Sequence, residues 1–151
     1  MGVKAGWSQI NSTPPLGLPM GGRGPRFSPG TEVLDSLAAQ AVVIEDGKGL
    51  CTLWISIDMI GMAWQKTSGF RQELSAMTGI PFEAIVINFS HTHSGPMSGF
   101  EGYATTKPKP PELEAYESDL LTRCIKMVMD AIEQMREVRR NGKIGALILK
   151  K

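Results

Sequence analysis

The sequence predicts an α/β domain, with a mixed β-sheet that contains a hairpin and a βαβ unit and is flanked by helices. Three short apolar segments bounded by turn residues, at 37–45, 50–58 and 84–89, predict core strands. Two further segments carry apolar residues at helical spacing, one between the second and third strands and one after them. The chain has 151 residues, the length of one domain, so we expect residues 1–151 to form a single domain with no second one.

The first 30 residues predict one strand and one long loop. Residues 3–10 alternate weakly between apolar and polar, which is typical of a strand with one partly covered face. Residues 13–30 contain five prolines and five glycines, which exclude regular structure. A loop of this length in a compact domain is usually functional or disordered.

The turn-rich segment 46–49 (DGKG) separates the next two strands, so residues 37–45 and 50–58 should pair as an antiparallel hairpin. The second of these strands carries apolar residues on both faces, among them Leu53 and Trp54. This pattern is typical of an interior strand that is covered on each side.

A short helix follows the hairpin. Phe70, Leu74 and Met77 lie at i, i+4 and i+7 and predict its buried stripe, and Gly79 predicts its C-terminal cap. Residues 84–89 (AIVINF) then predict the next strand. Strand, helix and strand in this order form a βαβ unit, so both strands should run parallel and end at the same edge of the sheet, where α/β proteins usually bind ligands.

The longest predicted helix covers residues 116–135, where apolar residues keep a 3.6-residue period for about five turns. Acidic residues crowd its start and three arginines within 136–140 its end, as the helix dipole favours, and the Asn-Gly pair at 141–142 predicts the stop. Residues 144–149 (IGALIL) predict a last strand.

Composition excludes several classes of partner. With 42% hydrophobic residues, 21% charged residues and a net charge of +1, the chain has no field that would steer it to nucleic acid or an anionic membrane. No segment approaches the roughly 20 apolar residues of a membrane span, and the N-terminus lacks the apolar core of a secretory signal. We therefore expect no nucleic-acid partner, no transmembrane segment and a cytoplasmic location. Cys51 and Cys124 lie in separate apolar runs, which predicts buried thiols rather than a disulfide.

The chemistry is concentrated at His91 and His93, the two histidines of the chain. In extended backbone, residues i and i+2 point the same way, so this pair can direct both imidazoles toward one point above the sheet edge. Zinc binds neutral imidazole, and its catalytic sites typically have three protein ligands and one open position. Spacing alone leaves two interpretations open, a metal or catalytic role and a hydrogen-bonded structural role.

Three other residues at this edge are candidates for the site. Ser94 and Gly95 follow the histidines and would allow a substrate to approach closely. Asp58, at the end of the neighbouring strand, would orient a histidine as an outer-shell carboxylate or, alternatively, cap the following helix.

Several separated motifs resemble the N-terminal region of the neutral/alkaline, non-lysosomal ceramidase family. They are residues 90–96 (SHTHSGP) after an apolar strand, together with residues 5–7 (AGW) and 13–20 (TPPLGLPM). The likeness continues through residues 34–37 (LDSL) and 56–58 (SID), and it covers roughly residues 3 to 135.

The resemblance implies a zinc-dependent amidohydrolase that cleaves the N-acyl amide bond of ceramide or a related lipid amide, releasing a sphingoid base and a fatty acid. His91 matches the family's first zinc ligand. His93 matches a neighbouring catalytic histidine that helps to hold the reacting water or the oxyanion. The Gly- and Pro-rich loop would then line the acyl or head-group channel or serve a purely structural purpose.

The chain departs from the family in the remaining ligands. In the family a second histidine, a glutamate and a tyrosine complete the zinc shell further along a longer chain, and this sequence has no third histidine. Glu101 and Tyr103 are local substitutes, although each is more typical of an ordinary loop residue. We therefore expect an incomplete ligand set, a truncated site, and weak or no activity from this chain alone, so that its status as an enzyme is open.

Two other hypotheses come from different classes of function. One is a non-catalytic domain that keeps the ceramidase-like scaffold and binds a lipid or a partner, with a homo-oligomer covering an exposed sheet edge. The other is an unrelated small α/β hydrolase in which His91 and His93 act as acid and base without a metal.

Overall fold

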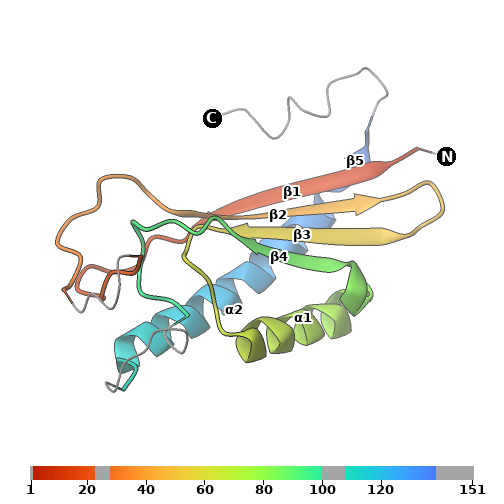
Figure 1. The fold of residues 1–151 in the computed structure, drawn as a ribbon. Coiled ribbons are helices and arrows are strands. Elements are labelled where there is room, and N and C mark those ends of the chain that lie inside the picture. The colour runs from red at the N-terminus through yellow and green to blue at the C-terminus, as the bar shows by residue number, and fades with distance from the viewer. Residues whose placement is uncertain (1, 23–27, 100–107, 139–151) are drawn as a thin grey trace.

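The computed structural model describes residues 2–22, 28–99 and 108–138, and in it one mixed sheet carries two helices on the same face (Figure 1). In chain order the elements are β1 (Lys4–Asn11), β2 (Ala38–Glu45), β3 (Cys51–Ile57), α1 (Trp64–Thr78), the 3-10 turn η1 (Phe82–Ala84), β4 (Ile85–Phe89), α2 (Pro111–Glu133) and β5 (Arg136–Glu137). The strand order across the sheet is β4-β3-β2-β1-β5. The predicted α/β fold with a mixed sheet is therefore confirmed.

Both predicted strand connections are present. The β2 and β3 strands pair antiparallel across the 46–49 turn, and β1 pairs antiparallel with β2. The β3 and β4 strands, joined through α1, pair parallel, with Ile57 opposite Phe89 at their ends. The hairpin and the βαβ unit thus lie side by side in one sheet, as the sequence predicts.

The α1 helix ends as predicted, but its buried stripe is shorter. Gly79 has a φ of 72°, the left-handed conformation of a C-terminal cap, and its N–H donates to the Ser75 carbonyl at 3.0 Å. Phe70 and Leu74 are buried, whereas Met77 is 51% exposed. The prediction that Met77 belongs to the core is wrong, because this residue lies in the last turn, where the chain is about to leave the helix.

The α2 helix packs very closely on the sheet. Ala39 and Ala41 on β2 are fully buried, and on β1 a Cβ atom added to Gly6 would lie 1.9 Å from the carbonyl oxygen of Ala131. Such a distance is possible only for a residue without a side chain. Small residues on β1 and β2 therefore let the backbone of α2 lie directly against the backbone of the strands.

The other face of the sheet is partly open. Trp7 and Trp54 are 44% and 53% exposed and lie in one row across the sheet with Val42 between them, in the register Trp7–Val42–Trp54. The prediction that β3 is covered on both faces is wrong, because both helices pack against the same face (Figure 1). Apolar residues on both sides of β3 thus mark an interior strand of a sheet with one covered face.

The end of α2 also differs from the prediction. The helix ends at Glu133, and Arg136 and Glu137 form the short strand β5, which pairs antiparallel with the edge of β1. The prediction that the helix runs to 135 with arginines in its last turn is wrong, because this segment hydrogen-bonds to an open strand edge instead. The predicted stop at 141–142 and the predicted strand at 144–149 lie outside the described residues.

A charge cluster links the two helices to the segment that precedes α2. Glu117 on α2 is 1% exposed and accepts hydrogen bonds from Lys66 of α1 at 2.7 Å and from Lys109 at 2.5 Å. Both lysines also pair with Glu114, and their hydrogen bonds, that of Lys109 first, lower the pKa of this carboxyl group. The cluster holds α1 and α2 together at the end of the sheet where both helices begin.

Neither helix in the described part of the chain is both long and apolar enough to cross a membrane. Both cysteines are free thiols. Cys124 is fully buried, as predicted, and burial raises the pKa of its thiol to about 12. Cys51 is only half-buried, with its sulfur 3.9 Å from the Glu45 carboxylate, so its predicted burial is only partly confirmed.

Candidate functional site

The candidate site lies at the sheet edge where β3 and β4 end together. The Ser90 N–H donates to the Ile57 carbonyl at 3.1 Å, and the His91 N–H donates to the Met59 carbonyl at 3.0 Å. These bonds continue the parallel pairing for two residues beyond β4. The prediction that Asp58 and the Ser90-His91 pair open on the same edge of the sheet is therefore confirmed.

The backbone and ring of His91 are both held in place. His91 has a φ of 58°, the only positive φ at a non-glycine position among the described residues. Such a conformation is uncommon outside glycine and often marks a functional site. The Nδ1 atom lies 2.8 Å from the Ile60 carbonyl oxygen. Because a carbonyl oxygen can only accept, this contact requires the proton on Nδ1 and leaves the Nε2 lone pair for another partner.

His93 lies beside His91. The ring centroids are 5.2 Å apart, the ring planes form an angle of 61°, and both side chains are exposed. The rings do come close together, but the predicted reason is wrong. The pair lies beyond the end of β4, and the left-handed backbone at His91, rather than a continuing strand, sets the direction of the chain.

The histidine pair fits part of a zinc shell. Imidazole nitrogens are common zinc ligands, and a ring held through its other nitrogen is typical of such sites. Among the described residues, however, no group of three or more His, Cys, Asp or Glu side chains could hold one metal ion. The alternative ligands Glu101 and Tyr103 lie outside the described residues. The pair therefore supplies at most two of the three protein ligands that a catalytic zinc site typically has.

The other candidate residues have clear places in the loops. The Asp58 carboxylate accepts a hydrogen bond from the Ala38 N–H at 3.0 Å, so it bonds to the start of β2. Ser94 is exposed, whereas Gly95 is buried and its carbonyl accepts a hydrogen bond from the Gly21 N–H at 3.1 Å. The Ser94 side chain is thus accessible to a ligand, and Gly95 joins two loops. The alternative that Asp58 caps the following helix is wrong, because the N-cap of α1 is Ala63 and no described side chain caps that end of the helix. The outer-shell role predicted for Asp58 and the substrate contacts predicted for Ser94 and Gly95 stay predictions.

The Gly- and Pro-rich loop after β1 is attached by backbone contacts to residues 90–99, which carry both histidines and are called the histidine loop below. Besides the Gly21–Gly95 bond, the Met97 N–H donates to the Pro19 carbonyl at 2.8 Å, and Met20 and Pro96 form an antiparallel bridge. Sequence reasoning placed this loop near the site but identified no residue of it as part of the site. Its glycines were the available signal, since glycine allows close approach of two backbones.

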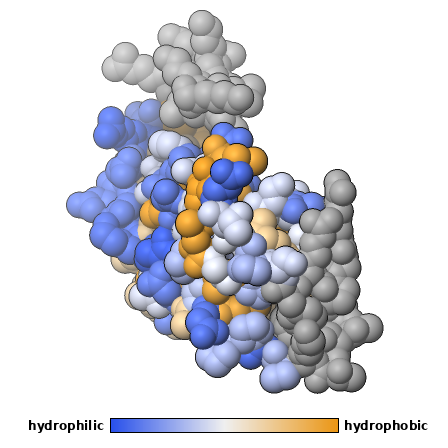
Figure 2. All heavy atoms as spheres, turned by 90° about the vertical axis from the view of Figure 1, so that its left-hand side faces the viewer, coloured by the Kyte–Doolittle hydropathy of each residue, from blue (hydrophilic) through white to orange (hydrophobic). Residues whose placement is uncertain are grey.

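Exposed apolar side chains lie in the segment between β1 and β2, which contains this loop. Leu16, Val33 and Leu34 are 57%, 49% and 84% exposed. Figure 2 views the molecule from the loop end of the sheet and shows a band of hydrophobic atoms bordered by hydrophilic ones. Apolar surface therefore lies at the same end of the molecule as the histidine loop.

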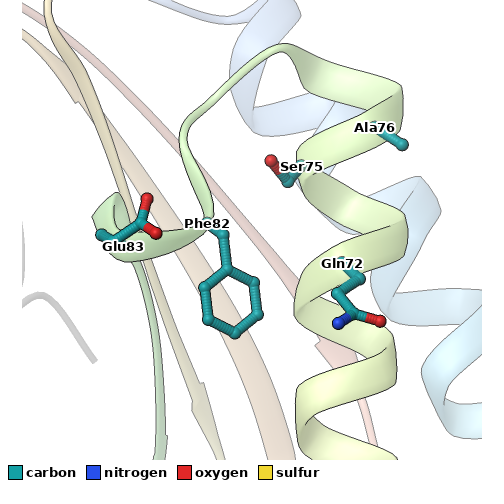
Figure 3. Close-up of a pocket in the computed structure, with 5 residues that line it drawn as sticks. All are labelled: Gln72, Ser75, Ala76, Phe82 and Glu83. Atoms are coloured by element: carbon teal, nitrogen blue, oxygen red, sulfur yellow. The ribbon is translucent and has the colours of Figure 1, made fainter.

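A hollow of about 400 Å³ lies elsewhere, between α1 and η1, and is lined by Gln72, Ser75, Ala76, Phe82 and Glu83 (Figure 3). Gln72, Ser75 and Ala76 line it from α1, and Phe82 and Glu83 line it from η1. Phe82 precedes β4 and His91 follows it, so the hollow is at the opposite end of this strand from the histidines. None of the predicted site residues lines it.

The fold is similar to those of solved ceramidase structures. A neutral ceramidase from Pseudomonas aeruginosa matches with a TM-score of 0.71 and 18% sequence identity, over 91% of this chain and 22% of that chain. A ceramidase complexed with C2 matches with a TM-score of 0.69 and 19% identity, over the same shares of each chain. This chain thus spans about a fifth of the length of these structures. No family model and no curated protein sequence matches it. A ceramidase-like fold is confirmed, in agreement with the resemblance of the motifs.

Proposed function

We propose that this chain carries part of the active site of a ceramidase-like zinc amidohydrolase, which cleaves the N-acyl amide bond of ceramide or a related lipid amide. The observation that carries the proposal is the orientation of His91. Its Nδ1 atom bonds to the Ile60 carbonyl and its ring is exposed beside His93, on the loop edge of a ceramidase-like fold.

In this proposal His91 is a zinc ligand through Nε2. The Ile60 carbonyl fixes the tautomer and raises the basicity of the ring, as outer-shell acceptors of metal-bound histidines do. The further ligands come from outside the described residues. A zinc ion bound there would lower the pKa of a bound water toward 7 and polarise the amide carbonyl.

The neighbouring residues of this chain bind and orient the reactants. His93 is near enough to His91 to hold a water or an oxyanion in the same small space. The exposed Ser94 contributes a hydroxyl donor next to the amide, and Asp58 keeps the end of β3 in place through its bond to Ala38. The apolar loop residues, among them Leu34, would contact the hydrocarbon part of a lipid amide.

The test is release of fatty acid from a fluorescent N-acylsphingosine by the purified chain, with added zinc and with a chelator. We expect weak release that the chelator and His91→Ala abolish and that His93→Ala reduces by about 100-fold, the scale of an acid–base residue. Lys48→Ala is the matched control, because Lys48 lies in the hairpin turn at the other end of the sheet. Release that neither the chelator nor His91→Ala reduces overturns the proposal. Release that survives chelation but needs both histidines overturns the zinc site and supports metal-free acid–base chemistry.

A second candidate function is favoured by the open face of the sheet. Trp7, Val42 and Trp54 form an apolar row there, and the outward positions of β1 to β4 carry no charged side chain. Interface cores are likewise depleted in charge and enriched in tryptophan. A non-catalytic domain would use this face to bind a partner or a second copy of the chain. Sedimentation velocity over a range of concentrations tests it, and a monomer that Trp54→Ser leaves unchanged contradicts a homo-oligomer.

A further inference from the structure

Gly22 packs directly against His93. Its φ is 104°, in the region that favours glycine, and a Cβ atom added there would lie 2.5 Å from both Cβ and Cγ of His93 and 2.7 Å from its Cα. Atoms of real side chains essentially never approach so closely. The Cα, Cβ and Cγ atoms of His93 therefore pack directly against the backbone of Gly22.

Neither partner in this contact can easily move away. On one side, the Gly21 N–H bonds to the Gly95 carbonyl at 3.1 Å and the neighbouring Met20 bridges to Pro96. On the other side, Gly95 is buried, and a Cβ atom there would meet the Leu37 side chain at 3.3 Å. The Gly21–Gly95 hydrogen bond and the Met20–Pro96 bridge hold the two backbones together next to the contact, so an added side chain at position 22 would displace His93.

We propose that Gly22 is a positioning residue for His93, because the absence of a side chain at position 22 sets the place from which the imidazole extends toward His91. The importance of this position for catalysis rests on the proposed function, whereas the geometric claim can be tested without any activity. A displacement of about 1 Å at a catalytic group can cost roughly 100-fold in rate, which is why such a contact would matter.

The test compares Gly22→Ala with Gly17→Ala. Gly17 lies in the same loop and has a similar φ of 97°, but a Cβ atom there would have no neighbour within 4 Å. Both variants place a side chain at a similar positive φ, and only Gly22→Ala adds the contact with His93. Because the chain has two histidines, their ring signals can be assigned with His91→Asn and His93→Asn.

We expect Gly22→Ala to shift the His93 ring signals and to abolish the nuclear Overhauser contact between the two histidine rings. Gly17→Ala should retain both. If Gly22→Ala does not fold, the double variant Gly22→Ala/His93→Gly should recover part of the lost stability, because the Cβ and Cγ contacts are then gone and only the contact with the Cα atom of residue 93 remains. An unchanged His93 signal in Gly22→Ala overturns the proposal, and so does a double variant no more stable than Gly22→Ala. Hydrolysis of N-acylsphingosine by the wild-type chain is judged separately, so failure of the proposed function leaves this test intact.

Discussion

The Nδ1 atom of His91 lies 2.8 Å from the carbonyl oxygen of Ile60. This contact determines which nitrogen of the ring carries the proton when the imidazole is neutral. It therefore also determines which nitrogen is left to bind a metal ion or a substrate.

We predict that neutral His91 is the Nδ1–H tautomer. Free imidazole side chains favour the other tautomer modestly, so a strong preference for Nδ1–H would reflect the Ile60 carbonyl. Nitrogen-15 spectra of the histidine rings at a pH where both are neutral measure this directly, with His93 as the internal comparison. A neutral His91 protonated on Nε2 would contradict the hydrogen bond and would leave the metal-binding nitrogen blocked.

The second prediction concerns zinc binding. Two neighbouring imidazoles should bind zinc more weakly than a complete site, and His91→Ala should weaken that binding by roughly tenfold or more, since it removes a ligand with an oriented ring. Titration calorimetry measures the affinity without any need for activity. Ser90→Ala is the matched control, because Ser90 precedes His91 and its backbone N–H, which donates to the Ile57 carbonyl, is retained in alanine. Equal zinc affinities of His91→Ala and the wild-type chain would exclude His91 as a ligand.

Local sequence patterns predicted the paired strands, but they did not predict contacts between segments that are distant in the chain. The β2–β3 hairpin and the Gly79 cap follow from turn and cap residues within a few positions of each other. By contrast, Trp54 is partly exposed because both helices pack against the other face of the sheet. The residue pattern within β3 does not indicate which face the helices cover. The contact of Gly22 with His93 joins segments far apart in the chain, so no local pattern could reveal it.

The third prediction uses two glycines with opposite surroundings. Gly6→Ala should destabilise the fold by about 3 kcal/mol, because its Cβ atom would collide with the Ala131 carbonyl and force α2 away from the sheet. Gly69→Ala should stabilise it by about 1 kcal/mol, since Gly69 lies inside α1 and an added Cβ atom there meets nothing within 4 Å. Urea denaturation of both variants measures the free energy of unfolding. A similar effect of the two substitutions would show that α2 does not pack on β1 as described.

The fourth prediction is a loss of stability at alkaline pH that originates in α2. Burial raises the pKa of the Cys124 thiol from 9.0 to about 12, and burial also raises the pKa of the Tyr116 phenol, whose hydroxyl donates to the Ser12 carbonyl at 2.5 Å. Each group is neutral when protonated, and the unfolded chain releases these protons at a lower pH than the folded chain. Above pH 9 the unfolded state therefore binds fewer protons, and the free energy of unfolding falls as the pH rises.

The thiol contribution is fully present below pH 9 and is lost as the pH approaches 12, while the phenol contribution begins to fall near pH 10. Cys124→Ala should therefore flatten the decline in unfolding free energy between pH 9 and pH 11, by an amount on the order of 1 kcal/mol. Cys51→Ala is the control, because the Cys51 thiol is only half-buried and should change the slope less. Urea denaturation at a series of pH values measures both. If the unfolding free energy of Cys124→Ala falls with pH as steeply as that of the wild-type chain, the thiol is not buried between α2 and the sheet. The packing of α2 against β1 and β2 is then looser than its buried residues indicate.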